Sequence, residues 1–123
     1  QWSSSVFTHL TANGALEALN SIAKLSDKNA IQINTWIIID DLSLLSLSTG
    51  QCDRILPFDK GAYLTNSEEN PLNCTAFKIE NIHEYYAKAG LEILDIQRGS
   101  WRGGRYFNDA RHYQDVIISR PSR

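Results

Sequence analysis

The sequence predicts a single α/β domain, and three patterns support this prediction. Residues 12–25 carry apolar side chains at helical spacing, and residues 79–89 do the same. Residues 31–39 and two segments near the C-terminus are rich in β-branched and apolar side chains, as buried strands are. The length of 123 residues is enough for one hydrophobic core and too short for two, so residues 1–123 form one domain.

The N-terminal third predicts a strand, a helix and a second strand. The first strand is expected at residues 5–8, before a helix from Ala12 to Leu25 with Thr11 as its N-cap. One apolar stripe follows this helix and contains Ala15, Leu16, Leu19, Ile22, Ala23 and Leu25. Residues 26–29 have the composition of a turn, and residues 31–39 form an apolar strand that is covered on both faces. This order predicts a parallel crossover unit.

The middle of the chain gives weaker signals. Leucines alternate with serines after Asp41, and Gly50, Pro57, Gly61 and Asn70-Pro71 interrupt any long element. A stretch of this length without regular structure is more often a lid or binding segment than an idle loop. We therefore expect residues 42–72 to form an insert that covers a site.

Regular patterns return in the last third. A second amphipathic helix begins at Ile79, and Gly90 suits its left-handed end. Residues 91–96 predict a strand, and residues 113–119 predict the last strand, which ends at Pro121. Because only a loop connects these two strands, they are expected to pair antiparallel.

Composition excludes several classes of partner. Twelve basic and 14 acidic residues give a formal net charge of −2, so the sequence predicts binding neither to nucleic acid nor to an acidic membrane. The apolar run at residues 36–39 is far shorter than the roughly 20 residues that cross a bilayer. Cys52 and Cys74 lack the spacing of zinc ligands, so we expect no metal site and two free thiols in a cytoplasmic protein.

Four segments carry a resemblance to a known family. They are SVFTHL, ALNSIAKLSDKNAIQINTWIIID, YYAKAGLEILDIQRGSW and QDVIISR, in this order along the chain. The combination resembles the C-terminal half of class I S-adenosylmethionine-dependent methyltransferases. The resemblance implies a partial Rossmann-like sheet with flanking helices, in which the strands correspond to strands 4-5-7-6 of the family and the last strand is antiparallel. The chain departs from the family at Asn29-Ala30, where two glycines are common.

The resemblance also implies a function. It predicts methyl transfer from S-adenosylmethionine to a small-molecule or sugar-type acceptor. The glycine-rich cofactor loop of the family would lie upstream of Gln1, so the chain is expected to be a C-terminal fragment that is inactive alone. Its first strand would be an exposed sheet edge, which favours a homo-oligomer through this strand.

The family pattern assigns roles to residues near the strand ends. Ser5, Val6 and Phe7 are expected to pass the methionine part of the cofactor, mainly through backbone groups. His9 is a candidate general base, since an imidazole near neutral pKa can take a proton from a hydroxyl. The alternatives are that Val6 and Phe7 are core residues and that His9 only bonds a neighbouring loop.

Further candidates follow the next strands. Asp40, after the second strand, is the second catalytic candidate, because a carboxylate there could orient or deprotonate a hydroxyl. Trp36, Trp101 and Arg102 are expected to contact the substrate, the indoles by ring faces and the guanidinium by gripping an anion. Their alternatives are a core aromatic for Trp36 and a solvated turn for Arg102.

Two other functions stay open at this stage. One is a small secreted binding module with a Cys52–Cys74 disulfide, which would need an oxidising compartment. The other is a non-catalytic dimerisation domain with the same fold.

Overall fold

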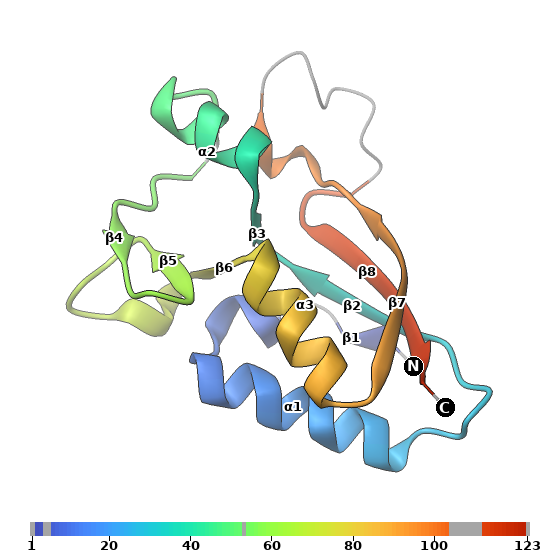
Figure 1. The fold of residues 1–123 in the computed structure, drawn as a ribbon. Helices are drawn as coiled ribbons and strands as arrows, with labels where there is room; N and C mark the ends of the chain where they lie inside the picture. Colours follow the sequence, from blue (N-terminus) through green and yellow to red (C-terminus); the bar gives the residue numbers. More distant parts are fainter. Residues whose placement is uncertain (1, 4–5, 53, 104–111, 123) are drawn as a thin grey trace.

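The computed structural model describes residues 2–3, 6–52, 54–103 and 112–122, and the chain forms helices and two sheets (Figure 1). Its described residues contain three α-helices and two four-stranded sheets, which confirms the α/β class. Among these residues we find no helix with the length and apolarity that crossing a membrane would require.

The larger sheet, called the main sheet, has a mixed strand direction. In spatial order it contains β1 (Trp2–Ser3), β2 (Gln32–Trp36), β8 (Asp115–Pro121) and β7 (Leu91–Gln97). β1 pairs parallel with β2, whereas β8 pairs antiparallel with both β2 and β7.

The first strand lies earlier in the chain than the sequence predicts. The prediction of a strand at residues 5–8 is wrong in position, because β1 covers Trp2–Ser3 and Val6–His9 form a short 3-10 helix, η1. The parallel pairing with the second strand is confirmed. η1 turns the Phe7 ring onto Trp36, with a centroid distance of 4.2 Å, and Phe7 is 1% exposed. The gain from burying this ring favours the turn over an extended strand.

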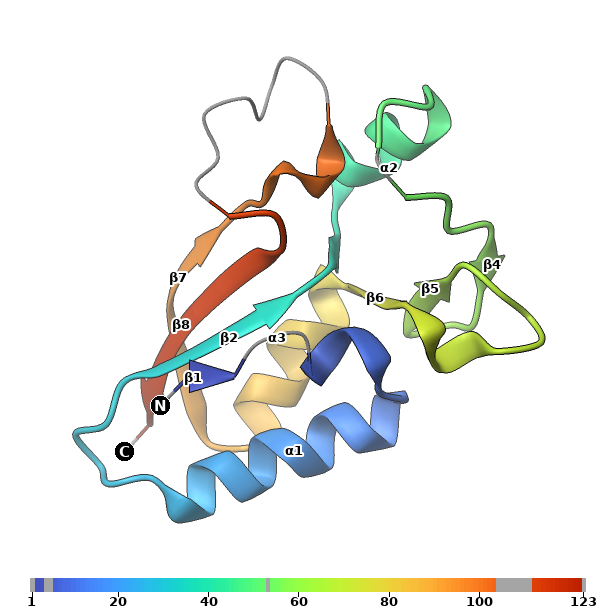
Figure 2. The same ribbon diagram turned by 180° about the vertical axis from the view of Figure 1, so that it is seen from behind.

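Two long helices flank the main sheet as the sequence predicts. α1 covers Ala12–Leu25, and the Thr11 hydroxyl accepts a hydrogen bond from the Gly14 amide at 3.1 Å as the N-cap. α3 covers Ile79–Lys88 and is followed by Gly90 with a φ of +75°, the left-handed conformation that glycine adopts without strain. α1 and α3 lie close to each other beside the sheet in both views (Figures 1 and 2).

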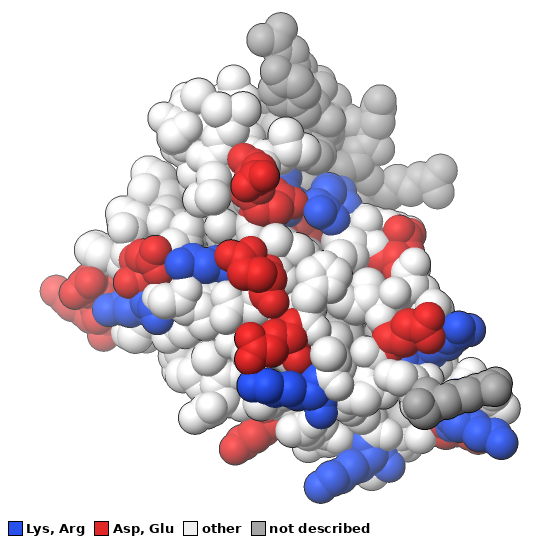
Figure 3. Space-filling model, viewed as in Figure 1, with Lys and Arg blue, Asp and Glu red and all other residues white. Residues whose placement is uncertain are grey.

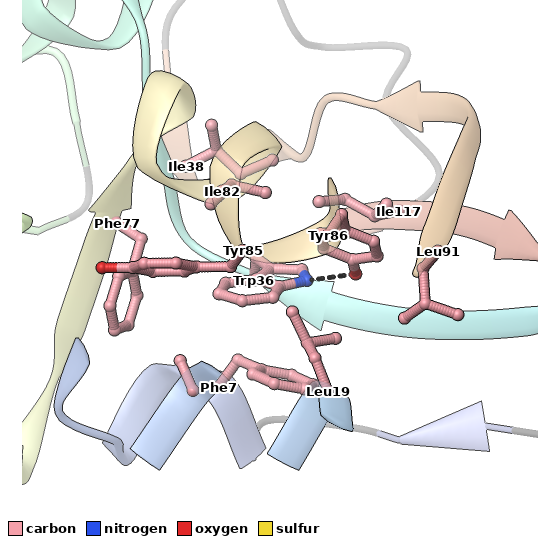
Figure 4. Packing of buried hydrophobic residues seen from close by; sticks show 11 residues of the cluster. Phe7, Leu19, Trp36, Ile38, Phe77, Ile82, Tyr85, Tyr86, Leu91 and Ile117 are labelled. Atoms are coloured by element: carbon pink, nitrogen blue, oxygen red, sulfur yellow. Dashed lines mark hydrogen bonds between the residues drawn. The ribbon is translucent and has the colours of Figure 1, made fainter. Parts of the chain in front are cut away.

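The main core lies between these helices and the sheet. Figure 4 shows Trp36 at its centre, with Phe7 below it and Tyr86 above, and the indole N–H donates to the Tyr86 hydroxyl at 3.0 Å. Burial raises the pKa of Tyr86, and this outweighs the opposite effect of hydrogen bonds from Asn34 and Trp36. Tyr85 and Tyr86 are both buried in the main core and pack α3 against the sheet.

The predicted insert, residues 42–72, contributes two strands to a second sheet, called the small sheet, and the segments on either side of it contribute the other two. In spatial order it contains β3 (Ile38–Ile39), β6 (Thr75–Lys78), β5 (Tyr63–Thr65) and β4 (Phe58–Asp59). Helix α2 (Asp41–Ser48) follows β3, and a 3-10 turn, η2 (Pro71–Asn73), precedes β6. A second apolar cluster beneath this sheet comprises Ile37, Ile39, Leu56, Leu64, Cys74, Ala76 and Trp101.

The prediction of one continuous strand at residues 31–39 is wrong, because the chain changes sheets at Ile37. β2 ends at Trp36, opposite the first residue of β8. Beyond this point the Ile37 carbonyl accepts from the Phe77 amide at 2.9 Å, so the backbone pairs with β6 instead. Ile38 then packs in the main core, while Ile37 and Ile39 pack in the second cluster, as alternation along an extended chain requires.

Candidate functional site

Three of the predicted site residues meet where the two sheets join. Asp40 follows β3, and Trp101 and Arg102 lie in a 3-10 turn, η3 (Ser100–Arg102), after β7. Trp101 and Arg102 both donate to Asp115, the first residue of β8, and Arg102 also contacts Asp40. With Arg98, these residues form a cluster that we call the junction network: Asp40, Arg98, Trp101, Arg102 and Asp115.

Asp115 is the centre of the junction network, and sequence reasoning missed it. Its buried carboxylate accepts hydrogen bonds from the amides of Gly99 at 2.6 Å and Ile38 at 2.7 Å, from the Trp101 indole at 3.0 Å, and from Arg102. Four donors and no acceptor suit an ionised carboxylate. Burial is the largest influence on Asp115 and raises its pKa, while the Arg102 charge and the donors act in the opposite direction.

Arg102 is fully buried and its contacts are with the chain itself. One nitrogen donates to Asp115, and the other donates to the Ile38 carbonyl at 2.9 Å and to Asp40 at 3.4 Å. Its guanidinium lies over the Trp101 ring, 4.9 Å from the ring centroid, and Trp101 is also fully buried. Both side chains are inaccessible to solvent. In this arrangement Arg102 therefore cannot bind a substrate anion, and Trp101 cannot contact a substrate, contrary to what the sequence analysis expects. They join the two sheets instead.

Asp40 is the member of the network with a predicted catalytic role, and it lies near the surface. Its side chain is 12% exposed, caps the N-terminus of α2 by accepting from the Ser43 amide at 2.9 Å, and accepts from Arg98 Nε at 2.7 Å. The Ser43 hydroxyl accepts from the Asp40 amide in return, which completes a capping box.

The surroundings of Asp40 keep its carboxylate ionised. Burial raises its pKa, but the hydrogen bond from Ser43 and the charges of Arg102 and Arg98 more than offset this, so the pKa lies below the usual value. A carboxylate with a lowered pKa is a poor general base near neutral pH. It remains a good hydrogen-bond acceptor, so Asp40 can orient a hydroxyl.

Two glycines let the chain pass through the junction. A Cβ at Gly99 would lie 2.3 Å from the Tyr113 carbonyl oxygen, and one at Gly103 would lie 1.8 Å from the Gln51 carbonyl oxygen. Gly103 also has a φ of +72°. Gly99 and Gly103 therefore reflect close backbone approach, and these glycines are the sequence signal that could have located the junction.

The residues predicted to pass the cofactor lie in or before η1. Ser5 lies outside the described residues, and Val6 begins η1. The Phe7 ring is buried on Trp36, and its carbonyl accepts from the Thr75 hydroxyl at 3.2 Å. Phe7 therefore has the core role given as its alternative.

His9 and Trp36 also have the structural roles that the sequence analysis gave as alternatives to their functional roles. His9 is exposed, and its Nδ1 lies 3.1 Å from the Leu72 carbonyl oxygen, so it bonds a neighbouring loop. Asp40 bonds Ser43 and Arg98 instead, so the two predicted catalytic residues belong to separate networks. Trp36 is fully buried in the main core, where its ring has no face open to a substrate.

Cys52 and Cys74 are both free thiols, so the disulfide of the secreted alternative does not form. Burial raises the pKa of the Cys74 thiol, which keeps it protonated and unreactive at neutral pH. In the part of the chain that the structure describes, no three His, Cys, Asp or Glu side chains come together in a way that could hold a metal ion.

No model of a protein family matches this chain, and no curated protein sequence matches it.

Proposed function

We propose that this chain is the trailing half of an S-adenosylmethionine-dependent methyltransferase domain that acts on a small-molecule or sugar-type acceptor. One observation carries the proposal. β8 runs antiparallel between β2 and β7, and β1 lies parallel on the other side of β2, which is the strand arrangement that the sequence resemblance implies.

The position of the insert supports the same proposal. Ligands of open α/β sheets bind beyond the carboxyl ends of the parallel strands. η1 follows the carboxyl end of β1 and contacts the insert through the Phe7–Thr75 and His9–Leu72 hydrogen bonds. The insert therefore covers the edge where an acceptor would bind, as a lid would.

The described residues do not fit S-adenosylmethionine by themselves. The ring and the carbonyl of Phe7 already have partners within the chain, and neither is free to contact the cofactor. The sequence of this chain also contains no glycine-rich loop of the kind that grips the cofactor in the family. The cofactor would supply an electrophilic methyl group, and this chain would supply one wall of the cleft, so we expect the chain alone to be inactive.

Asp40 has an orienting role in this proposal. Methyl transfer depends mainly on aligning the acceptor with the methyl group, and a base is optional. The lowered pKa of Asp40 and its small exposed surface suit a carboxylate that accepts a hydrogen bond from a hydroxyl of the molecule to be methylated. Arg98, which is 33% exposed, holds this carboxylate in place from the solvent side.

We also propose a cytoplasmic location and, for residues 1–123 on their own, a homo-oligomer through β1. The two free thiols suit a reducing compartment. Acidic and basic side chains are interspersed on the α3 face (Figure 3), which suits a small-molecule substrate better than nucleic acid. β1 is the outer strand of the main sheet, and an outer strand offers unpaired backbone groups to a second copy.

Calorimetry with S-adenosylmethionine tests the proposal. The product of the complete reading frame should bind the cofactor, and residues 1–123 alone should not. Tight binding to residues 1–123 would contradict our account of the cleft. An absence of binding to the complete product would favour the non-catalytic dimerisation domain instead.

A further inference from the structure

Helix α2 exposes three of its four leucines and buries two of its three serines. Leu42, Leu44 and Leu45 are 51%, 48% and 57% exposed, whereas Ser43 and Ser46 are 0% and 4% exposed. Ser43 is buried because it completes the capping box with Asp40. Burying a leucine side chain stabilises a protein by roughly 1.5–3 kcal/mol, so a ligand that covers these exposed leucines would be stabilised.

Two leucines of α2, Leu44 and Leu47, line a groove of about 630 Å³ between this helix, Cys52 and residues 54–57. Its apolar walls include Leu44, Leu47, Leu56 and Leu64, and the 79% exposed Ile55 lies at its rim. A second hollow of about 510 Å³ shares Arg54, Ile55, Leu56 and Pro57 with it. Volumes of a few hundred Å³ with mostly apolar walls are typical of small-molecule sites.

One cation, Arg54, lines both hollows. Its guanidinium lies 5.5 Å from the centroid of the Tyr113 ring, and one terminal nitrogen donates to the Cys74 sulfur at 3.5 Å. Within the described residues Arg54 forms no ion pair with a carboxylate, and its Nε is buried without a hydrogen-bond partner. A buried N–H without a partner is costly, and a guanidinium fork matches a carboxylate.

We propose that this groove binds an amphipathic carboxylate, with its apolar body against the leucines of α2 and its carboxylate on Arg54. The charge of Arg54 selects an anion over a neutral or cationic ligand, and the leucine walls select an apolar chain over a sugar or nucleotide. The site goes beyond the proposed function, since it requires neither the cofactor nor methyl transfer.

Titration of the ¹⁵N-labelled protein with decanoate and with decanol, followed by NMR, tests this site. Decanoate should shift the amide resonances of α2 and of residues 54–57, and decanol should bind at least about tenfold more weakly, because it lacks the charge that Arg54 recognises. Equal affinities for the two ligands, shifts confined to other parts of the chain, or no binding would each overturn the proposal.

Matched variants sharpen the test. Arg54→Gln should weaken decanoate binding about tenfold and leave decanol binding unchanged, whereas Leu44→Ser should weaken both. Arg120→Gln and Leu25→Ser, which change an exposed arginine and an 82% exposed leucine outside the groove, should change neither. Unchanged decanoate binding by Arg54→Gln would overturn the proposal, and the titration of the parent protein decides it if that variant does not fold.

The other possible occupant is a second copy of the chain. Analytical ultracentrifugation of the parent and of Leu44→Ser separates the two cases. A dimer that Leu44→Ser abolishes and that decanoate does not dissociate would overturn the carboxylate site. A monomer at all concentrations, or a dimer that Leu44→Ser leaves intact, as pairing through β1 would give, supports it. Because no cofactor is present in these measurements, their outcome is independent of the methyltransferase proposal.

Discussion

The main sheet and the insert differ in how they bury apolar side chains. In the main sheet, α1 and α3 turn their apolar stripes inward, and the largest aromatic rings stack around Trp36. In the insert, α2 turns Ser43 and Ser46 inward and leaves three of its four leucines exposed, and a groove lies beside the helix. The comparison indicates that the main sheet is built for stability, whereas the insert retains apolar surface that a ligand can cover.

The junction network is where a single change should affect both regions most. Asp115→Ala removes the acceptor of the buried Arg102 and of the Trp101 indole. Leaving a buried charge uncompensated costs about 3–5 kcal/mol, so the free energy of unfolding should fall by this amount in denaturant titrations. Asp95→Asn, at an exposed aspartate of β7, is the control and should change it by less than about 0.5 kcal/mol. A small effect of Asp115→Ala would show that the junction does not hold the sheets together.

Leucines of the two regions should respond differently to truncation. Leu19→Ala opens a cavity in the main core, where Leu19 is fully buried, and should cost about 2–5 kcal/mol. Leu45→Ser, on the exposed side of α2, should change the free energy of unfolding by less than about 0.5 kcal/mol. Thermal or chemical unfolding of both variants measures the contrast. Similar losses would mean that the insert is packed as tightly as the main core.

A smaller effect is expected at the hydroxyl of Tyr86. Tyr86→Phe leaves the Trp36 indole and the Asn34 amide without their shared acceptor in the main core. An unsatisfied buried donor costs about 1–3 kcal/mol, so the free energy of unfolding, measured in denaturant titrations, should fall by this amount. Tyr63→Phe, at a half-buried ring of the small sheet, is the matched control and should lose less. Equal losses in the two variants would rule out a structural role for the Tyr86 hydroxyl.

The smallest effect concerns pH and Asp40. Its folded-state pKa lies below the usual value of 3.8, so the ionised form is favoured in the folded protein. The stability that this gives is present above the unfolded pKa and is lost as the pH falls through the folded pKa. The difference in unfolding free energy between the parent and Asp40→Asn should therefore be about 1 kcal/mol at pH 7 and shrink below about pH 4. A difference between the parent and Asp40→Asn that grows on acidification would contradict the assignment.

The sequence predicts the main sheet better than the insert, for physical reasons. α1 and α3 carry apolar stripes at helical spacing, and their caps at Thr11 and Gly90 are local signals. α2 has no such stripe, because its leucines alternate with serines, and the strands of the small sheet have two to four residues. Whether strands this short form, and where, depends on pairing with residues that are distant in the chain.

The candidate site shows the same division. The sequence placed Asp40, Trp101 and Arg102 on one edge, and the structure does bring them together. It could not predict that Arg102 is buried, because its partner Asp115 begins a strand 13 residues later without any local signal. Likewise, the continuous apolar run through Ile37 gives no sign that the chain changes sheets there. The change depends on the hydrogen bond from the Phe77 amide to the Ile37 carbonyl, and Phe77 is distant in the chain.

The most direct test of the central proposal is a crystal structure of the complete reading-frame product with S-adenosylmethionine. We predict a further parallel strand beside β1, on the side opposite β2, and the cofactor beyond the carboxyl ends of these strands. The proposal is contradicted if β1 remains the outer strand of the sheet or if the cofactor binds elsewhere.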